Sequence, residues 1–306
     1  MNHLETPPDP TTGLWTTASR EVMRLSDDRA LSYSLYGASE GPCVLVLDGP
    51  GSRGLAAGAA PAARELGIRL VAPDRPGFGG TDTPKGAGIA GWPEDCAALL
   101  DHLGVERAGI LSQSGGTPYG LAAASALPER IVAIALLGAI APTDDPSSVA
   151  ELGGQVRGGI KLARRAPWLL RLLLAPMART ARRDPEKLAR KVAQDLPPAD
   201  AAVVADPRLW EIHVRASQEI LLRPAAIARE IGLLARPWGF SVANVKVPAA
   251  FWSGECDEVH PASQSRRLAV DLDDAPVHLV PEAANFGLLP RYSDALRFAA
   301  GLPPDA

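Results

Sequence analysis

Short apolar runs alternate with helix-like segments along this sequence, and the alternation limits the folds that the chain can adopt. Buried strands of a parallel sheet read as continuous apolar runs because helices cover both of their faces. An alternating pair of runs at 21–27 and 30–36 comes first and predicts a hairpin. The whole pattern predicts an α/β fold built on a doubly wound, mostly parallel sheet. Strands are expected at 42–47, 68–72, 108–111, 131–138, 247–253 and 277–281, and helices at 56–66, 92–103, 115–126, 261–270 and 291–300.

The alternation is interrupted once, between 142 and 245, where only helical patterns occur. An interruption of this length is far larger than an ordinary loop. We therefore expect a helical lid at 142–245 inserted into an α/β core formed by 19–141 and 246–306. Residues 1–18 are rich in proline and threonine and are expected to form a loose N-terminal arm.

Composition excludes several classes of protein. Hydrophobic residues make up 46% of the chain and charged residues 22%, which excludes a disordered or fibrous protein. The net charge of −4 gives no sign of a nucleic-acid partner. Cys43, Cys96 and Cys256 are too widely spaced for a disulfide framework or a metal site, so no metal or other cofactor is expected. Because no signal peptide is visible and the longest apolar stretch, 131–142, is too short for a membrane span, we expect a cytoplasmic protein.

The most informative segment is ILSQSGGTPY at 110–119. An apolar strand ends at Ser114, and small residues open a helix directly after it. A nucleophile elbow, G-x-S-x-G, requires this context, because its tight turn lifts the serine hydroxyl out of the sheet. Ser112 replaces the first glycine of the motif, whereas Gly115 and Gly116 keep the crowded side of the turn free of side chains.

Four further segments stand in a recognisable order and spacing: DGPGS at 48–52, APDRPGFGGTD at 72–82, GECD at 254–257 and EAANFG at 282–287. Together with the elbow they resemble motifs of the α/β-hydrolase superfamily, in particular its lid-bearing branch of epoxide hydrolases, haloperoxidases and esterases. The resemblance covers most of the chain and implies that Ser114 is the nucleophile and Asp257 the acid. It also implies an oxyanion hole formed by the N–H groups of Gly115 and Gly49, with Gln113 as a further binding residue.

Two positions depart from the family pattern. Asn285 stands where the family has its histidine base, and Asp48 stands at or beside the place of the histidine that precedes the oxyanion turn. An amide cannot store a proton, and losing a triad base lowers kcat by roughly 10⁴- to 10⁶-fold. Ester hydrolysis through Asn285 is therefore not expected. Asp48 either bonds to its own turn or faces the pocket, where a raised pKa would let it act as an acid or base.

Other side chains could complete a site. His260, three residues after Asp257, is the best substitute for the missing base, and His213 in the lid is the next. Trp210, Trp252 and Phe286 are candidates for lining a pocket, although core packing would explain most such aromatic residues.

The lid carries a concentrated positive charge. Between 157 and 191 there are eleven Lys or Arg residues and two Asp or Glu residues, a local balance of 11 − 2 = +9. This segment is either the solvated outer face of the lid or a surface for an anionic partner, an acyl carrier or a membrane.

These observations lead to three alternative functions. The first is an enzyme that has lost serine-hydrolase chemistry and acts as a non-hydrolytic biosynthetic catalyst, in which Ser114, Asn285 and Gly115 hold a carbonyl or enolate while Asp257 or Asp48 moves a proton. The reactions open to it are cyclisation, C–C bond formation or a lyase step on a bulky, natural-product-like small molecule, with polycyclic and anionic compounds both left open. The second is a serine hydrolase whose base is His260 or His213, and the third is a ligand-binding protein without turnover. The sequence leaves the oligomeric state open, a homodimer included.

Overall fold

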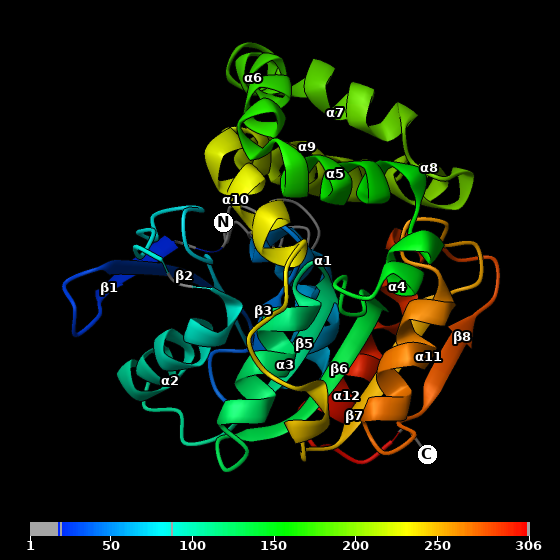
Figure 1. The fold of residues 1–306 in the computed structure, drawn as a ribbon. Helices are drawn as coiled ribbons and strands as arrows, with labels where there is room; N and C mark the ends of the chain where they lie inside the picture. Colours follow the sequence, from blue (N-terminus) through cyan, green and yellow to red (C-terminus); the bar gives the residue numbers. More distant parts are fainter. Residues whose placement is uncertain (1–17, 19, 87, 305–306) are drawn as a thin grey trace, which may run out of the picture.

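Eight strands form one sheet at the centre of the molecule (Figure 1). The computed structural model describes residues 18, 20–86 and 88–304, so the expected arm at 1–18 lies, except for Ala18, outside the described residues. The strand order is β1-β2-β4-β3-β5-β6-β7-β8. β1, β2 and β4 pair antiparallel in turn, and all later pairs are parallel, which confirms the mostly parallel sheet and the hairpin. The strands are β1 Arg20–Arg24, β2 Ala30–Gly37, β3 Cys43–Leu47, β4 Arg69–Pro73, β5 Ala108–Ser114, β6 Ile131–Ala139, β7 Ala249–Gly254 and β8 Val277–Val280.

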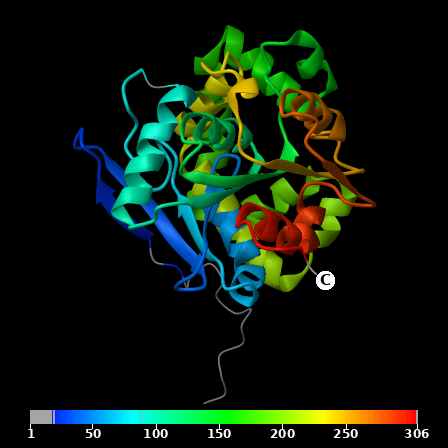
Figure 2. The same cartoon turned by 90° about the horizontal axis from the view of Figure 1, so that it is seen from below.

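Helices cover both faces of this sheet (Figure 2). Successive side chains of β3 point to opposite faces of the sheet, so Leu45 packs into one hydrophobic core and its neighbour Val46 into the other. Because both faces are buried, every residue of this strand is apolar. The first core lies under α2 Trp92–His102, α3 Thr117–Ala126 and α11 Ala262–Asp271, and the second under α1 Ser52–Glu65 and α12 Tyr292–Ala299.

All but one of the expected helices and strands begin and end within three residues of their expected bounds. The exception, α1, and the longer β5 both bear on the site. Helix α1 begins at Ser52, four residues before the expected start at 56, because the helix follows the Gly51 turn directly despite the glycine at position 54. Strand β5 continues three residues past 111 to Ser114 itself, paired with β6.

Seven helices lie between β6 and β7, above the end of the sheet at which the parallel strands finish (Figure 1). We call them the cap. Six of the seven begin with proline, whose missing N–H and fixed φ suit the first turn of a helix. They are α4 Pro146–Glu151, α5 Gly154–Arg165, α6 Pro167–Arg183, α7 Pro185–Gln194, α8 Pro198–Val204, α9 Pro207–Leu221 and α10 Pro224–Leu234. The division into core and lid at 142 and 245 stays a prediction. None of the helices in the described part of the chain has the length and apolar character needed to cross a membrane.

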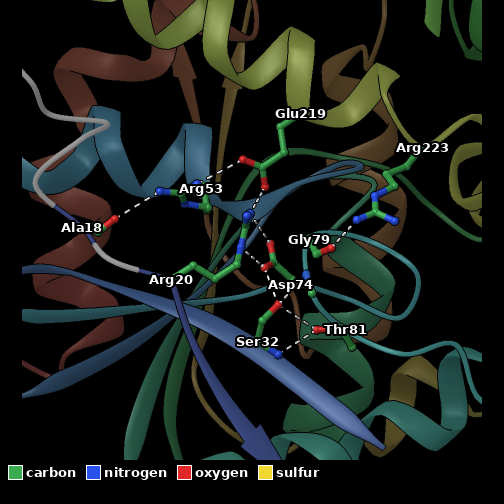
Figure 3. A network of polar contacts seen from close by, with 10 residues as sticks. Ala18, Arg20, Ser32, Arg53, Asp74, Gly79, Thr81, Glu219 and Arg223 are labelled. Carbon is green, nitrogen blue, oxygen red and sulfur yellow. Dashed lines mark hydrogen bonds and ion pairs between the residues drawn. The ribbon is translucent and has the colours of Figure 1, made fainter. Parts of the chain in front are cut away.

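A cluster of charges fastens α9 of the cap to the core (Figure 3). Glu219 of α9 pairs with Arg20 of β1 and, at 3.1 Å, with Arg53 of α1. Arg20 also donates to the buried carboxylate of Asp74 at 2.7 Å. One turn beyond Glu219, Arg223 donates to the carbonyl of Gly79 at 2.7 Å. These bonds hold one side of the cap in a fixed position over the sheet.

Candidate active site

Ser114 stands at the sharp turn between β5 and α3. Its φ of 50° lies in the left-handed region, which is strained for a residue with a side chain and is typical of a nucleophile elbow. A side chain at Gly116 would overlap the carbonyl of Leu47, so this position of the turn requires glycine. Ser112 is accommodated in place of the motif's first glycine because Gly120 faces it, where a Cβ would stand 3.2 Å from the Ser112 Cβ. The elbow is therefore formed although the motif is incomplete.

An imidazole reaches the Ser114 hydroxyl. His260 Nε2 lies 3.0 Å from Ser114 Oγ, and the His260 side chain is buried. The backbone between β7 and α11 directs the ring there, because the Asp257 carboxylate accepts hydrogen bonds from the N–H groups of Val259 at 2.9 Å and His260 at 2.8 Å. This local turn folds His260 back toward the elbow. A histidine therefore lies within hydrogen-bonding reach of Ser114 although Asn285 stands at the family position of the base, so the assumption of the non-hydrolytic alternative that Ser114 has no neighbouring imidazole is wrong.

Asp257 lies behind the same imidazole. Its Oδ2 is 4.0 Å from His260 Nδ1, and both atoms are buried without a hydrogen-bond partner among the described residues. An approach of about 1 Å would join them, and such bonds are often loose before substrate binds. Burial raises the pKa of Asp257 to about 6 and lowers the pKa of His260 to about 4, so at neutral pH the carboxyl is mostly ionised and the ring is neutral.

Asn285 has a different partner. Its side-chain oxygen accepts a hydrogen bond from Gln113 Nε2 at 2.9 Å, and its backbone carbonyl accepts one from the same nitrogen at 3.1 Å. The following N–H groups, of Phe286 and Gly287, donate to the buried Asp200 carboxylate of α8 at 2.7 and 3.2 Å. Within the described residues Asn285 has no hydrogen bond to Ser114, and its contacts fix the loop after β8.

The oxyanion turn differs from expectation. The N–H of Gly49 donates to the side chain of Asp48 at 2.6 Å, so it is not free to bind a substrate oxygen. The Asp48 carbonyl in turn accepts a bond from Arg75, whose guanidinium pairs with buried Glu230 at 2.5 Å. The Gly115 N–H lies beside this turn, with its nitrogen 3.5 Å from where a Cβ on Gly49 would stand. Only the Gly115 half of the expected oxyanion hole is therefore in place.

Two cavities flank the elbow. The serine cavity, of about 290 Å³, contains Ser114, Gly115 and His260. The Asp48 cavity, of about 230 Å³, contains Asp48 and Gln113. The serine cavity is closed by the cap residues Gln155, Val156, Gly159, Ile160, Ile227, Glu230, Ile231 and Leu234 together with Pro50 and Ile140.

Asp48 faces the second cavity. Burial raises the pKa of its carboxyl to about 7, and the Gly49 N–H and Arg75 oppose that rise only in part. His213 and Phe286 line the same cavity, as expected for pocket residues. His213 is bonded through Nε2 to the carbonyl of Ala189 at 3.1 Å, so it does not serve Ser114.

Two aromatic candidates do not line either cavity. Trp252 is buried in the core, where its ring stacks on His278 with centroids 5.0 Å apart. Trp210 bonds through its indole N–H to Glu186 at 3.1 Å at the cap surface. Sequence reasoning missed the buried Arg75–Glu230 pair, because its partners are 155 residues apart and only Arg75 lies in a family motif.

Comparison with known proteins agrees with the fold. A doubly wound sheet with a strand–serine–helix turn and a helical cap is the arrangement of the α/β-hydrolase fold. The model of the alpha/beta hydrolase fold family matches residues 44–202, just over half of the chain, and the chain belongs to this family.

Curated relatives match shorter stretches. The chain is 33% identical over 114 residues to the uncharacterized hydrolase YcgS of Bacillus subtilis, covering 37% of this chain and 39% of that protein. It is 36% identical over 74 residues to the 2-hydroxy-6-oxo-2,4-heptadienoate hydrolase of Pseudomonas putida F1, covering 24% of this chain and 27% of that protein. The matches thus span about two fifths or less of these relatives' length.

Solved structures match over nearly the whole chain. A hydrolase from Pseudomonas aeruginosa PA01 superposes with a TM-score of 0.66 at 21% identity, covering 91% of this chain and 97% of that one. The enol-lactonase from Burkholderia xenovorans LB400 superposes with a TM-score of 0.63 at 21% identity, covering 90% and 97%. Identities this low support the shared fold alone.

Proposed function

We propose that this protein is a serine hydrolase that cleaves an ester or a related acyl bond. Ser114 is the nucleophile, His260 the general base and Asp257 the acid that orients and stabilises the imidazolium. The observation that carries the proposal is the 3.0 Å separation of Ser114 Oγ and His260 Nε2. A hydroxyl is a weak nucleophile until a neighbouring base takes its proton, and this separation is within hydrogen-bonding reach.

The reaction follows from these positions. As Ser114 Oγ attacks the carbonyl carbon, its proton passes to His260 Nε2, and the negative charge that develops on the carbonyl oxygen is stabilised by the Gly115 N–H. The imidazolium then gives the proton to the leaving oxygen, and water attacks the acyl-enzyme by the same route. Closure of the gap between Asp257 and His260 pairs the new positive charge with a carboxylate. Because the Gly49 N–H is bonded to Asp48, the oxyanion has one donor fewer than in a complete oxyanion hole. Compared with a site that has both donors, kcat is lower by about 10²- to 10³-fold.

The lining of the serine cavity favours a neutral, apolar acyl group. Helices α5 and α10 contribute most of its lining residues, five of these are aliphatic, and none of the described lining residues is Lys or Arg. Glu230, the acidic residue in the lining, is neutralised by Arg75. The cavity offers no positively charged side chain to bind an anionic substrate. We therefore propose that the substrate is a small, mainly apolar ester.

The proposal is tested by kinetics on p-nitrophenyl esters of short and medium chain length. His260→Gln should lower kcat/KM by about 10³- to 10⁴-fold, because glutamine cannot store the proton. His213→Gln is the matched control, since His213 is as buried as His260 but lines the other cavity, and it should leave kcat/KM nearly unchanged. Equal activity in wild type and His260→Gln would exclude His260 as the base.

A second candidate function is supported by Asp48. A carboxyl with a pKa of about 7 that lines an apolar cavity can give or take a proton near neutral pH, as a non-hydrolytic catalyst acting on a carbonyl or enolate would require. Wild type without esterase activity, together with Asp48-dependent hydrogen–deuterium exchange at the α-carbon of a ketone ligand, would favour this function. Ligand binding without either reaction would favour a protein that only binds.

A further inference from the structure

The outer face of helix α6 is apolar and basic. Trp168 is 66% exposed, and Leu172 and Leu173 are each 59% exposed. Trp168, Leu172 and Arg179 lie on one side of α6, and Leu173 and Arg171 lie at its two opposite edges, because successive residues are turned by about 100° around a helix. Arg165, the last residue of α5, and Arg171 and Arg179 of α6 are exposed and close to them in the chain. We call these six residues the α6 face.

The opposite side of α6 is already packed. Leu170, Ala178 and Ala181 are buried against the rest of the cap, so the apolar residues of the outer face are not needed to hold the helix in place. Helix α6 lies in the part of the cap farthest from the sheet (Figure 1). The α6 face is therefore accessible to a large, flat partner.

The charges of this surface are unbalanced. From 157 to 183 the chain has eight Lys or Arg residues and no Asp or Glu, in a protein of net charge −4. Arg165, Arg171 and Arg179 form no ion pair with any described residue. A partner that complements this surface has negative charge and an apolar layer beside it.

We propose that the α6 face docks the protein onto the surface of an anionic phospholipid bilayer. Tryptophan suits the boundary between headgroups and acyl chains, leucine enters the apolar layer, and arginine reaches the phosphates while its stem lies along the chains. A second copy of this chain fits less well, because a two-fold contact would bring the same positive charges together. Nucleic acid would neutralise the arginines but leave Leu172 and Leu173 without an apolar partner.

Docking would place the roof of the serine cavity at the bilayer. Val156, Gly159 and Ile160 of α5 line that cavity, and α5 runs directly into α6 through Ala166. An apolar ester dissolved in the bilayer would then meet the cap segment that covers Ser114. This consequence rests on the proposed hydrolase function, whereas the docking itself does not.

Sedimentation with vesicles tests the docking without an activity measurement. Full-length protein is mixed with vesicles of phosphatidylcholine alone or with about 30% phosphatidylglycerol, at low salt and at about 0.5 M salt. We expect binding to the anionic vesicles at low salt and weak binding in the other three conditions. Binding to neither vesicle at low salt would overturn the proposal, as would equal binding to both.

Variants separate insertion from simple attraction. The triple change Trp168→Ser, Leu172→Ser and Leu173→Ser should lower the partition constant at least about tenfold, because it removes the apolar side chains that would enter the acyl layer. The control Val22→Ser with Val270→Ser alters exposed valines outside the cap, whose side chains are 59% and 70% exposed, and it should bind like wild type.

Each of the charge variants Arg171→Gln and Arg179→Gln should weaken binding about fivefold. Unchanged binding by the triple variant would overturn the proposal, as would equal loss in the control. The proposal would also be overturned if the wild-type protein bound no vesicles and formed a dimer that the triple change disrupted. That result would assign the α6 face to a second copy of the chain.

Discussion

The carboxylate of Asp48 accepts the hydrogen bond of its own neighbour, Gly49, at 2.6 Å. An N–H at this place in the family fold would otherwise be available to a substrate oxygen. The same contact therefore weakens one half of the oxyanion hole. Burial raises the pKa of the Asp48 carboxyl to about 7 although this hydrogen bond acts to lower it.

Removing this carboxylate should increase hydrolysis. In Asp48→Ala the Gly49 N–H is free to donate to the oxyanion, and kcat for ester hydrolysis should rise by as much as about 10²- to 10³-fold. Asp48→Asn, whose side-chain oxygen can keep the bond, should stay near wild type. Steady-state kinetics on one p-nitrophenyl ester compares the three proteins. A fall in kcat in both variants would instead indicate that Asp48 takes part in the reaction.

Asp48 should also make stability depend on pH. Because burial raises its pKa from 3.8 to about 7, the ionised form destabilises the folded state, fully above pH 7 and not at all below about pH 4. Asp48→Asn should therefore raise the free energy of unfolding at pH 8 by on the order of 2–4 kcal/mol. Urea unfolding at pH 8 and pH 4 measures the difference, which should disappear at the lower pH. A constant difference at both values would mean that the carboxyl is not desolvated.

The rate of hydrolysis should fall below about pH 6. Asp257, whose pKa is raised to about 6, must be ionised to stabilise the imidazolium, so protonating it removes that support, whereas His260 stays neutral down to about pH 4. Asp257→Asn should lower kcat by about 10⁴-fold and remove this limb of the kcat profile. A profile that falls near pH 6 in the variant as well would assign the limb to another group.

The buried Arg75–Glu230 pair, which contacts the oxyanion turn, should be important for stability. Glu230 accepts bonds from Arg75 at 2.5 Å and from the Tyr119 hydroxyl at 2.8 Å, and Arg75 also holds the Asp48 carbonyl. Glu230→Gln leaves a buried guanidinium without its counter-charge, which should cost about 3–5 kcal/mol in urea unfolding. Glu219→Gln, at a pair that is about a quarter exposed, serves as the control and should cost about 1 kcal/mol or less. Similar losses in the two variants would contradict this account of the pair.

The sequence predicted best those elements whose structure is determined by residues that are neighbours in the chain. The apolar run of β3 had to be buried on both faces, and the small residues after Ser114 permit only a tight turn into a helix. The orientation of His260 was not predictable in the same way, since it depends on two backbone N–H groups bonding to Asp257. The spacing of Asp257 and His260, three residues apart, was the signal available, and it suggested a substitute base without fixing its direction. The bond of Gly49 to Asp48 depends on one side-chain rotamer, which no sequence pattern specifies.

The most direct test of the central claim is covalent labelling of Ser114. A fluorophosphonate reacts only with a serine whose proton a neighbouring base can take, and mass spectrometry of the digested protein identifies the modified residue. We expect wild type and His213→Gln to be labelled at Ser114, and His260→Gln to be labelled about 10³-fold more slowly. Equal labelling of wild type and His260→Gln, or no labelling of wild type, would contradict it.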